Sequence, residues 1–179
     1  MEFMFMPLKR YADFSGRSRR MEYWMWVLFQ FLLYLALWVV FFALAGAALW
    51  SNDAGGALAA GATLIIFLLL YMVIGLALLV PSLAVTVRRL HDTNRSGWWL
   101  GGFMLAYLAL VVVNAAMMGV IAQSPESLGA ATALYGIIGL AMFGYGIVLL
   151  VFMFLDGTPG PNRYGPDPKG RANAGDVFA

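Results

Sequence analysis

The middle of the chain carries the sequence Arg88-Arg89-Leu90-His91-Asp92-Thr93-Asn94-Arg95-Ser96-Gly97-Trp98-Trp99. This stretch holds three of the eleven Lys and Arg residues and the only His, and a long apolar run lies on each side of it. No other segment in the middle of the sequence is comparably polar. The pattern therefore predicts two apolar helices that are joined by a polar connection.

The composition of the chain is far more apolar than that of a soluble domain. Hydrophobic residues make up 63% of the 179 residues, charged residues make up 11%, and the mean hydropathy is +0.82. A soluble domain is about half apolar and about a quarter charged. Because a chain of this length cannot bury such an excess, we expect an integral membrane protein.

Four apolar runs are long enough to cross a bilayer, which needs about 20 residues of helix. They cover residues 23–50, 58–87, 98–122 and 130–155, and Pro81 predicts a kink in the second. We therefore predict an all-α membrane protein with four transmembrane helices in a bundle. Aromatic side chains at the predicted helix ends would anchor them in the interfaces; they are Tyr23, Trp24, Trp98 and Trp99.

The ends of the chain differ from this bundle in composition. Residues 156–179 are rich in Pro and Gly, which predicts turns and extended segments. Residues 1–22 are basic and mixed, and they are too polar to resemble a cleaved signal peptide. Two interpretations of this N-terminal segment stay open: a disordered leader, or a short interfacial helix that uses Leu8, Tyr11, Ala12 and Phe14.

The distribution of charge predicts the orientation. With four spans, all eleven Lys and Arg residues fall on one side of the membrane, and the loops on the other side carry only Asp53 and Glu126. Short loops that are rich in Lys and Arg stay in the cytoplasm. We therefore expect both termini and the central polar stretch to be cytoplasmic, where the polar clusters would form a cap.

Few polar residues lie inside the predicted spans. No Asp, Glu, Lys, Arg or His lies deep in any of them, which disfavours an ion-coupled transporter. Gln30 and Asn114 do lie inside spans, and an unpaired amide in hydrocarbon is costly. We expect both to form hydrogen bonds between helices.

The predicted cap suggests an anion site, because guanidinium groups match phosphate oxygens in a bidentate geometry. A phospholipid headgroup is the obvious ligand. The predicted ligand-binding residues are Arg17, Arg20, Arg88, Arg89 and Arg95, with Arg19 close by. The residues predicted to orient them or to close the cap are Glu22, His91, Asp92, Asp156, Asn162 and Tyr164. The alternative is that the arginines only anchor helix ends and pair with nearby acids.

Catalysis and metal binding have little support. The chain has one His and no Cys, whereas the usual metal sites need three or four ligands. Ser82 and Ser96 lie near His91-Asp92, but we interpret them as helix caps rather than nucleophiles. We expect no enzyme activity, no cofactor and no nucleic-acid partner. A pH-sensing role for His91 rests only on the chemistry of imidazole.

Three ordered motifs show a family resemblance: Phe14-x-Gly16-Arg17-x-x-Arg20-x-Glu22-Tyr23-Trp24, then Arg88-Arg89-Leu90-His91-Asp92 with Ser96-Gly97-Trp98-Trp99, and Gly160-x-Asn162-x-Tyr164-Gly165-Pro166-x-Pro168. From about Met6 to Pro168 the chain resembles the bacterial family called domain of unknown function 805. The resemblance implies a small helical protein of the bacterial inner membrane, and it supplies no catalytic residue.

We therefore expect a non-enzymatic membrane protein whose cap binds an anionic group, either lipid phosphate or a protein partner. A small channel or transporter, which could be a homo-oligomer, and a structural subunit of a larger complex remain alternatives.

Overall fold

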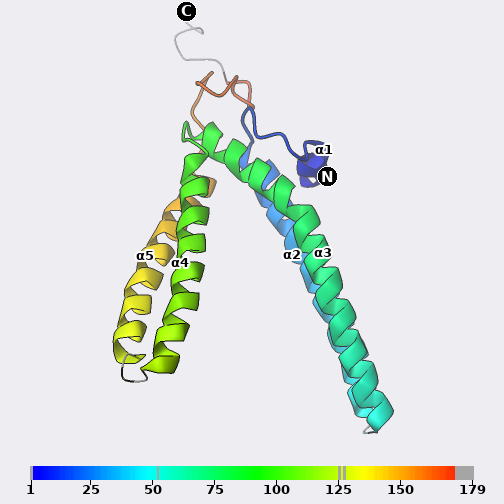
Figure 1. The fold of residues 1–179 in the computed structure, drawn as a ribbon. Helices are drawn as coiled ribbons and strands as arrows, with labels where there is room; N and C mark the ends of the chain where they lie inside the picture. Colours follow the sequence, from blue (N-terminus) through cyan, green and yellow to red (C-terminus); the bar gives the residue numbers. More distant parts are fainter. Residues whose placement is uncertain (1, 52, 125, 127, 172–179) are drawn as a thin grey trace, which may run out of the picture. The chain divides into compact units, whose positions relative to one another are not determined.

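The computed structural model describes residues 2–51, 53–124, 126 and 128–171, and the elements found there are helical (Figure 1). A short helix comes first and four long ones follow. Their bounds are α1 Glu2–Lys9, α2 Arg20–Trp50, α3 Ala54–Asp92, α4 Trp98–Gln123 and α5 Leu128–Phe154. The last four are 26 to 39 residues long and apolar enough to cross a membrane. The predicted four transmembrane helices are thus confirmed.

Helix α3 is longer than the sequence predicted. It begins at Ala54 instead of residue 58, and it continues past residue 87 to Asp92. The first part of the central polar stretch is therefore helical and not a loop. Pro81 lies inside α3, which does not end there.

The end of α3 is set by Asn94, which adopts the left-handed conformation with φ 58°. The amide of Asn94 donates to the carbonyl of His91 at 3.0 Å, and the amide of Arg95 donates to the carbonyl of Leu90 at 2.9 Å. These two bonds form a Schellman motif, which satisfies the last carbonyls of a helix. Asn tolerates the left-handed conformation better than most residues, so the helix ends here and the chain turns toward α4.

The described chain divides into two compact units. The first comprises Met1–Phe14 and Met21–Val85, and the second comprises Ser15–Arg20 and Thr86–Ala179.

In the first unit, α2 and α3 are joined by hydrogen bonds around one hydroxyl group. The indole Nε1 of Trp26 and the amide Nε2 of Gln30 both donate to Ser82 Oγ, at 3.0 and 2.7 Å. The hydroxyl in turn donates to the carbonyl of Leu78 at 2.6 Å. The predicted interhelical bond of Gln30 is confirmed. The interpretation of Ser82 as a helix cap was wrong, because this residue lies inside α3.

Aromatic rings also contribute to the contact between α2 and α3. The rings of Trp38 and Phe41 lie 4.8 and 4.5 Å from the ring of Phe67, and Tyr34 lies 4.9 Å from Tyr71. Large aromatic surfaces of this kind supply much of the packing in a helix pair. These ring contacts hold α2 and α3 together as an antiparallel hairpin.

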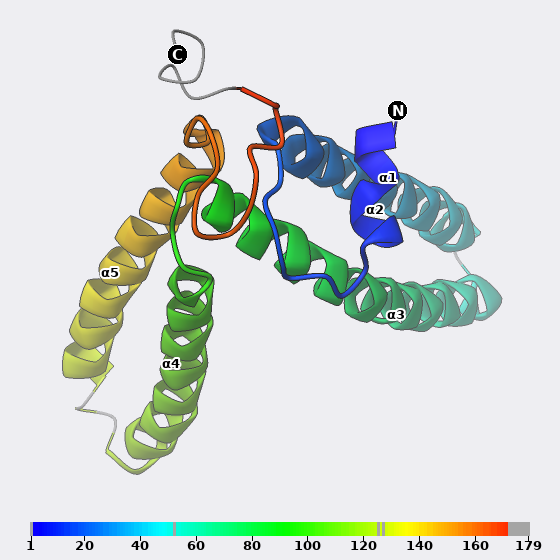
Figure 2. The ribbon, with the colours of Figure 1, turned by 90° about the horizontal axis from the view of Figure 1, so that it is seen from above.

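Helix α1 packs against α2 (Figure 2). The rings of Phe5 and Phe29 lie 5.4 Å apart, and the hydroxyl of Tyr11 donates to the carbonyl of Ala77 at 2.5 Å. The N-terminal segment therefore contains a helix, but at residues 2–9. Leu8 belongs to it, whereas Tyr11, Ala12 and Phe14 follow it.

In the second unit, α4 and α5 form a hairpin. The ring of Trp99 lies edge-on to the rings of Tyr145 and Phe152, and the Tyr145 hydroxyl donates to the carbonyl of Trp99 at 2.8 Å. Farther along, the hydroxyl of Tyr135 donates to the backbone carbonyl of Asn114 at 3.4 Å. The bond between Asn114 and α5 is made by the backbone carbonyl, so the bond predicted for the side-chain amide of Asn114 is not found among the described residues.

Candidate functional site: an arginine–aspartate network

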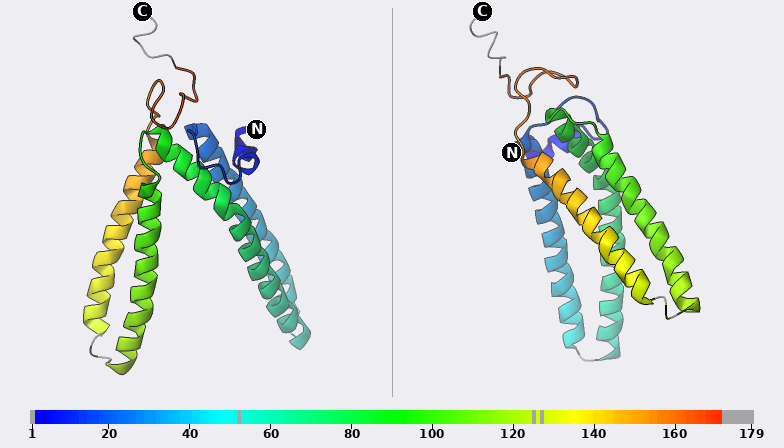
Figure 3. Two further views of the ribbon diagram at one scale, coloured as in Figure 1. Left: turned by 45° about the horizontal axis from the view of Figure 1, so that its top comes forward. Right: turned by 90° about the vertical axis from the view of Figure 1, so that its left-hand side faces the viewer.

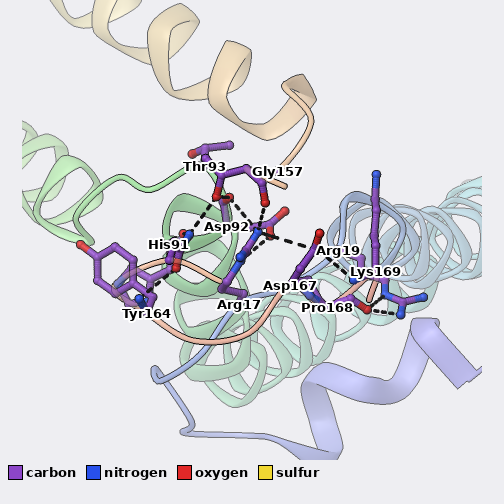
Figure 4. Close-up of polar contacts among 12 residues, drawn as sticks. Arg17, Arg19, His91, Asp92, Thr93, Gly157, Tyr164, Asp167, Pro168 and Lys169 are labelled. Carbon is purple, nitrogen blue, oxygen red and sulfur yellow. Dashed lines mark hydrogen bonds and ion pairs between the residues drawn. The ribbon is translucent and has the colours of Figure 1, made fainter. Parts of the chain in front are cut away.

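The carboxylate of Asp92, in the last turn of α3, binds the guanidinium groups of Arg17 and Arg89. Figure 4 shows Arg17 beside Asp92. Arg17 Nη2 lies 2.8 Å from Oδ1, and Arg89 Nη1 lies 2.5 Å from Oδ2. The side chains of all three residues are at most 2% exposed. Arg89 and Asp92 share one helix face because they are three positions apart. We call these three residues, with the backbone carbonyls that they bind, the polar network.

Arg17 ties the polar network to the segment after α5. Its Nη1 donates to the carbonyl of Gly160 at 2.7 Å, and its Nη2 donates to the carbonyl of Thr158 at 2.6 Å. Gly16 and Gly160 have φ values of 77° and 71°, which glycine adopts at little cost. Gly16 lets the chain turn just before Arg17, and Gly160 lets it turn in the segment whose carbonyl binds the Arg17 guanidinium.

Arg89 ties the polar network to the end of α5. Its Nε donates to the carbonyl of Met153 at 3.3 Å, and its Nη2 donates to the carbonyl of Leu155. The last carbonyls of a helix lack partners within the helix and carry partial negative charge. The buried cation of Arg89 therefore neutralises the C-terminal end of α5.

The segment after α5 lies directly on the end of α3 (Figure 3). The amide of Thr158 donates to the carbonyl of Asp92 at 2.9 Å. A Cβ atom at Gly157 would overlap the Asp92 carboxylate, so only glycine fits this close approach. The predicted turns of this segment are confirmed as far as Arg171, with a bridge between Asn162 and Gly165.

His91 lies beside the polar network and stacks on Tyr164. The two rings are 3.8 Å apart and only 5° from parallel. His91 Nδ1 lies 3.2 Å from the carbonyl of Gly16, an interaction that requires the proton on Nδ1. The side-chain amide Nδ2 of Asn162 donates to the backbone carbonyl of His91 at 3.0 Å. His91, Asn162 and Tyr164 thus hold the segment after α5 against α3.

A second cluster surrounds Asp156, whose side chain is 50% exposed. Lys169 Nζ, Arg171 Nη1 and Arg20 Nε lie 2.5, 3.4 and 3.8 Å from its carboxylate oxygens. The hydrogen bond from Lys169 lowers the pKa of Asp156, partial burial opposes this, and the charges of Lys169 and Arg20 lower it further. We call these four residues the Asp156 cluster. It holds three cations around one anion.

Asp167 is an additional acid that the sequence reasoning missed. Its side chain is 3% exposed, and its carboxylate lies 2.7 Å from Arg171 and 3.9 Å from Arg17. Burial alone would raise the pKa of Asp167, but the hydrogen bonds from Arg171 and the Lys169 amide and the nearby positive charges lower it to about 2. The only sequence signal was the spacing of four residues between Asp167 and Arg171.

Three further arginines of the second unit contact carbonyls or aromatic rings. Arg19 Nε donates to the carbonyl of Pro168 at 2.6 Å. The guanidinium of Arg95 lies 4.1 Å from the ring centre of Phe152, which is a cation–π contact. Arg163 Nη2 donates to the carbonyl of Asn94 at 3.2 Å.

Other predicted site residues take different positions. Arg88 is fully buried, and its backbone carbonyl accepts from the amide of Ser18 at 3.2 Å. Glu22 is buried in the first turn of α2 and belongs to the first unit, as do Tyr23 and Trp24. Trp98, at the start of α4, is 75% exposed. Among the residues that the structure describes, no three or more His, Asp or Glu side chains are grouped as a metal site.

Four long apolar helices and a buried arginine–aspartate network together define a multi-pass integral membrane protein of the all-α class. The chain belongs to the family described as "Protein of unknown function (DUF805)", whose model matches residues 11–166.

Relatives in Escherichia coli K12 are similar over almost the whole chain. The inner membrane protein YhaI is 31% identical over 173 residues, which are 97% of this chain and all of the relative. The inner membrane protein YhaH is 28% identical over 169 residues, or 94% of this chain and 98% of the relative. No solved structure matches the chain. The protein is thus a multi-pass protein of the bacterial inner membrane.

Proposed function

We propose that the protein is a non-enzymatic membrane protein whose polar segments form a cytoplasmic cap that binds the phosphates of anionic lipid headgroups. The observation that carries this proposal is the Asp156 cluster, where three cations surround one half-exposed carboxylate. Arg171 also pairs with Asp167, so two carboxylates face the three cations, and the cluster retains an excess of positive charge that favours an anion.

The buried and the exposed arginines have different roles in this proposal. Arg17 and Arg89 direct their guanidinium groups at Asp92 and at backbone carbonyls, so they hold the cap together. The side chains of Arg20, Lys169 and Arg171 are 47%, 30% and 32% exposed, so they have surface to offer a ligand. Of the predicted anion-binding arginines, the proposed site keeps only Arg20, and it adds Lys169 and Arg171.

The position and the charge of the cluster support a headgroup as the ligand. Asp156 follows the last residue of the apolar helix α5 by two positions, which corresponds to the depth where hydrocarbon gives way to headgroups. Residues 15–20, 86–97 and 155–171 carry nine basic and three acidic side chains. The cytoplasmic leaflet is rich in anionic lipid, and each Lys or Arg near it contributes about 1 kcal/mol to binding.

The test compares two triple variants by native mass spectrometry in mild detergent. Arg20→Gln, Lys169→Gln and Arg171→Gln together remove the cations of the cluster. Lys9→Gln, Arg10→Gln and Arg163→Gln together remove the same charge elsewhere. Both are titrated with phosphatidylglycerol and with phosphatidylethanolamine.

We expect the cluster variant to lose affinity for phosphatidylglycerol, by about fivefold for each cation removed. The control variant should keep most of its affinity, and phosphatidylethanolamine should bind weakly to every form. Equal losses in the two variants would mean that net charge alone attracts the lipid, and this outcome would overturn the assignment of a site.

A further inference from the structure

Two aspartates bind Arg171, and they differ in burial. The side chain of Asp156 is 50% exposed, whereas that of Asp167 is 3% exposed. Both aspartates and all three cations of the Asp156 cluster belong to the second unit. A lipid headgroup can therefore reach the first carboxylate but not the second.

Asp167 fixes the guanidinium group of Arg171 along one edge. Arg171 Nε donates to Asp167 Oδ2 at 2.7 Å, and its Nη2 donates to Oδ1 at 3.5 Å. The same Nη2 also donates to the carbonyl of Gly157 at 3.0 Å. Because the donors of a guanidinium group form a rigid planar fork, these bonds direct the remaining Nη1 at the Asp156 carboxylate, which lies 3.4 Å away.

Asp167 also places the other cation of this segment, Lys169. Its Oδ1 accepts from the backbone amide of Lys169 at 2.9 Å, and its backbone carbonyl accepts from the amide of Gly170 at 2.9 Å. An Asp side chain that bonds the backbone two residues ahead stabilises a turn. From this turn Lys169 Nζ reaches the Asp156 carboxylate at 2.5 Å.

Asp156 has the opposite relation to these cations. Its carboxylate oxygens lie where the three cations of the cluster converge, namely Arg20, Lys169 and Arg171. A phosphate group accepts charge-assisted hydrogen bonds from the same kinds of donor. A phosphate at this point therefore has to compete with Asp156 for them.

We propose that the two aspartates act on anion binding in opposite directions: Asp167 positions Arg171 and Lys169 for a phosphate, and Asp156 occupies their donors until a phosphate replaces it. This inference rests on the proposed function, because it concerns phosphates bound at the Asp156 cluster. It differs from an effect of charge alone. Removing either acid raises the net charge by one, so charge alone predicts tighter binding of an anion in both cases.

The test titrates variants with phosphatidylglycerol and measures binding by native mass spectrometry in mild detergent. Asp156→Asn should raise the affinity about fivefold, which is the effect of one charge near a headgroup. Asp167→Asn should lower the affinity roughly threefold, most of what the loss of one cation would cost. In a protein that already carries Lys169→Gln and Arg171→Gln, Asp167→Asn should cause no further loss, whereas a merely structural role would lower the affinity there too.

Arg171→Lys tests the positioning with less risk to the fold, because Arg171 is partly exposed. It preserves the charge but lacks the fork that bonds Asp167 and Asp156 together, so the affinity should fall roughly threefold. Arg10→Lys and Asp13→Asn are the matched controls, because they make the same exchanges in an ion pair outside the cluster. Each should change the affinity by less than about twofold.

Circular dichroism at the titration temperature confirms that each variant is folded, and if Asp167→Asn is not, Arg171→Lys and Asp156→Asn decide the question. Tighter binding by Asp167→Asn, wild-type binding by Arg171→Lys, or unchanged binding by Asp156→Asn would each overturn the inference. The proposed function fails separately, if the triple variant without the cations of the cluster binds phosphatidylglycerol as well as the wild type does.

Discussion

Arg17 and Asp92 are 75 positions apart in the sequence, yet their side chains form an ion pair at 2.8 Å in which both are almost completely buried. The carboxylate is shared with Arg89, so one anion serves two cations. The other N–H groups of the two guanidinium groups donate to backbone carbonyls, which partly offset the excess positive charge. These carbonyls belong to Met153, Leu155, Thr158 and Gly160. Asp92 is therefore the residue on which the polar network depends most.

Asp92→Asn should destabilise the protein strongly. The substitution preserves shape but leaves Arg17 and Arg89 buried without an anion, a change that costs about 3–5 kcal/mol. Thermal unfolding in detergent, followed by circular dichroism, measures the loss. Asp13→Asn is the control, because the pair of Asp13 and Arg10 is about one-third exposed and should contribute under about 1 kcal/mol. Equal losses for the two variants would contradict the central role of Asp92.

Gly157→Ala should also destabilise the polar network, for a steric reason. The added methyl group would overlap the Asp92 carboxylate and push the segment after α5 away from α3. Gly144→Ala, where the new methyl group meets nothing within 4 Å, should be tolerated. Thermal unfolding of the two variants in detergent tests this prediction. Similar unfolding temperatures would show that the close approach at Gly157 is unimportant.

The contribution of Asp167 should depend on pH. Its pKa in the folded protein is lowered from 3.8 to about 2, so its charged form stabilises the fold above pH 3.8. This contribution is lost as the pH falls through the window from about 3.8 to about 2. The stability difference between wild type and Asp167→Asn should therefore be largest near pH 5, and most of it should be lost by pH 2. A difference that does not change across this window would show that the charge of Asp167 is not responsible.

Ser82→Ala should loosen the hairpin of α2 and α3. It removes the acceptor for Trp26 and Gln30 together and leaves two donors without their partner, at a cost of about 1–3 kcal/mol. Unfolding followed by tryptophan fluorescence measures this change. Thr63→Ala, which removes an exposed hydroxyl bonded only within its own helix, should have a much smaller effect. Two equal effects would refute the role assigned to Ser82.

The four apolar helices could be predicted because a span must satisfy its own backbone and present apolar side chains to lipid, and both demands appear as long uncharged runs. The end of α3 could not be predicted in this way. Charged residues after Val87 resemble a loop, but Arg89 and Asp92 pair along one helix face, and the stop signal is the left-handed Asn94. Such a signal is weak in a single sequence.

The members of the polar network could be named from the sequence, but their partners could not. Arg17 and Arg89 were expected to face a ligand, whereas their donors meet backbone carbonyls of the segment after α5. The position of those carbonyls depends on the path of a segment rich in Pro and Gly, which local patterns do not encode. Asp167 was missed for the same reason.

The order in which the polar network becomes complete follows from its connectivity. A ribosome makes Arg17 first and Asp92 midway, and the carbonyls of residues 153–160 follow only after almost all of α5 has been made. Until then, Arg17 and Arg89 can pair only with Asp92 and with water. Closure of the network therefore marks a nascent chain in which every membrane helix has been synthesised, and a chain that is truncated before residue 153 would leave Arg17 and Arg89 without these carbonyl partners.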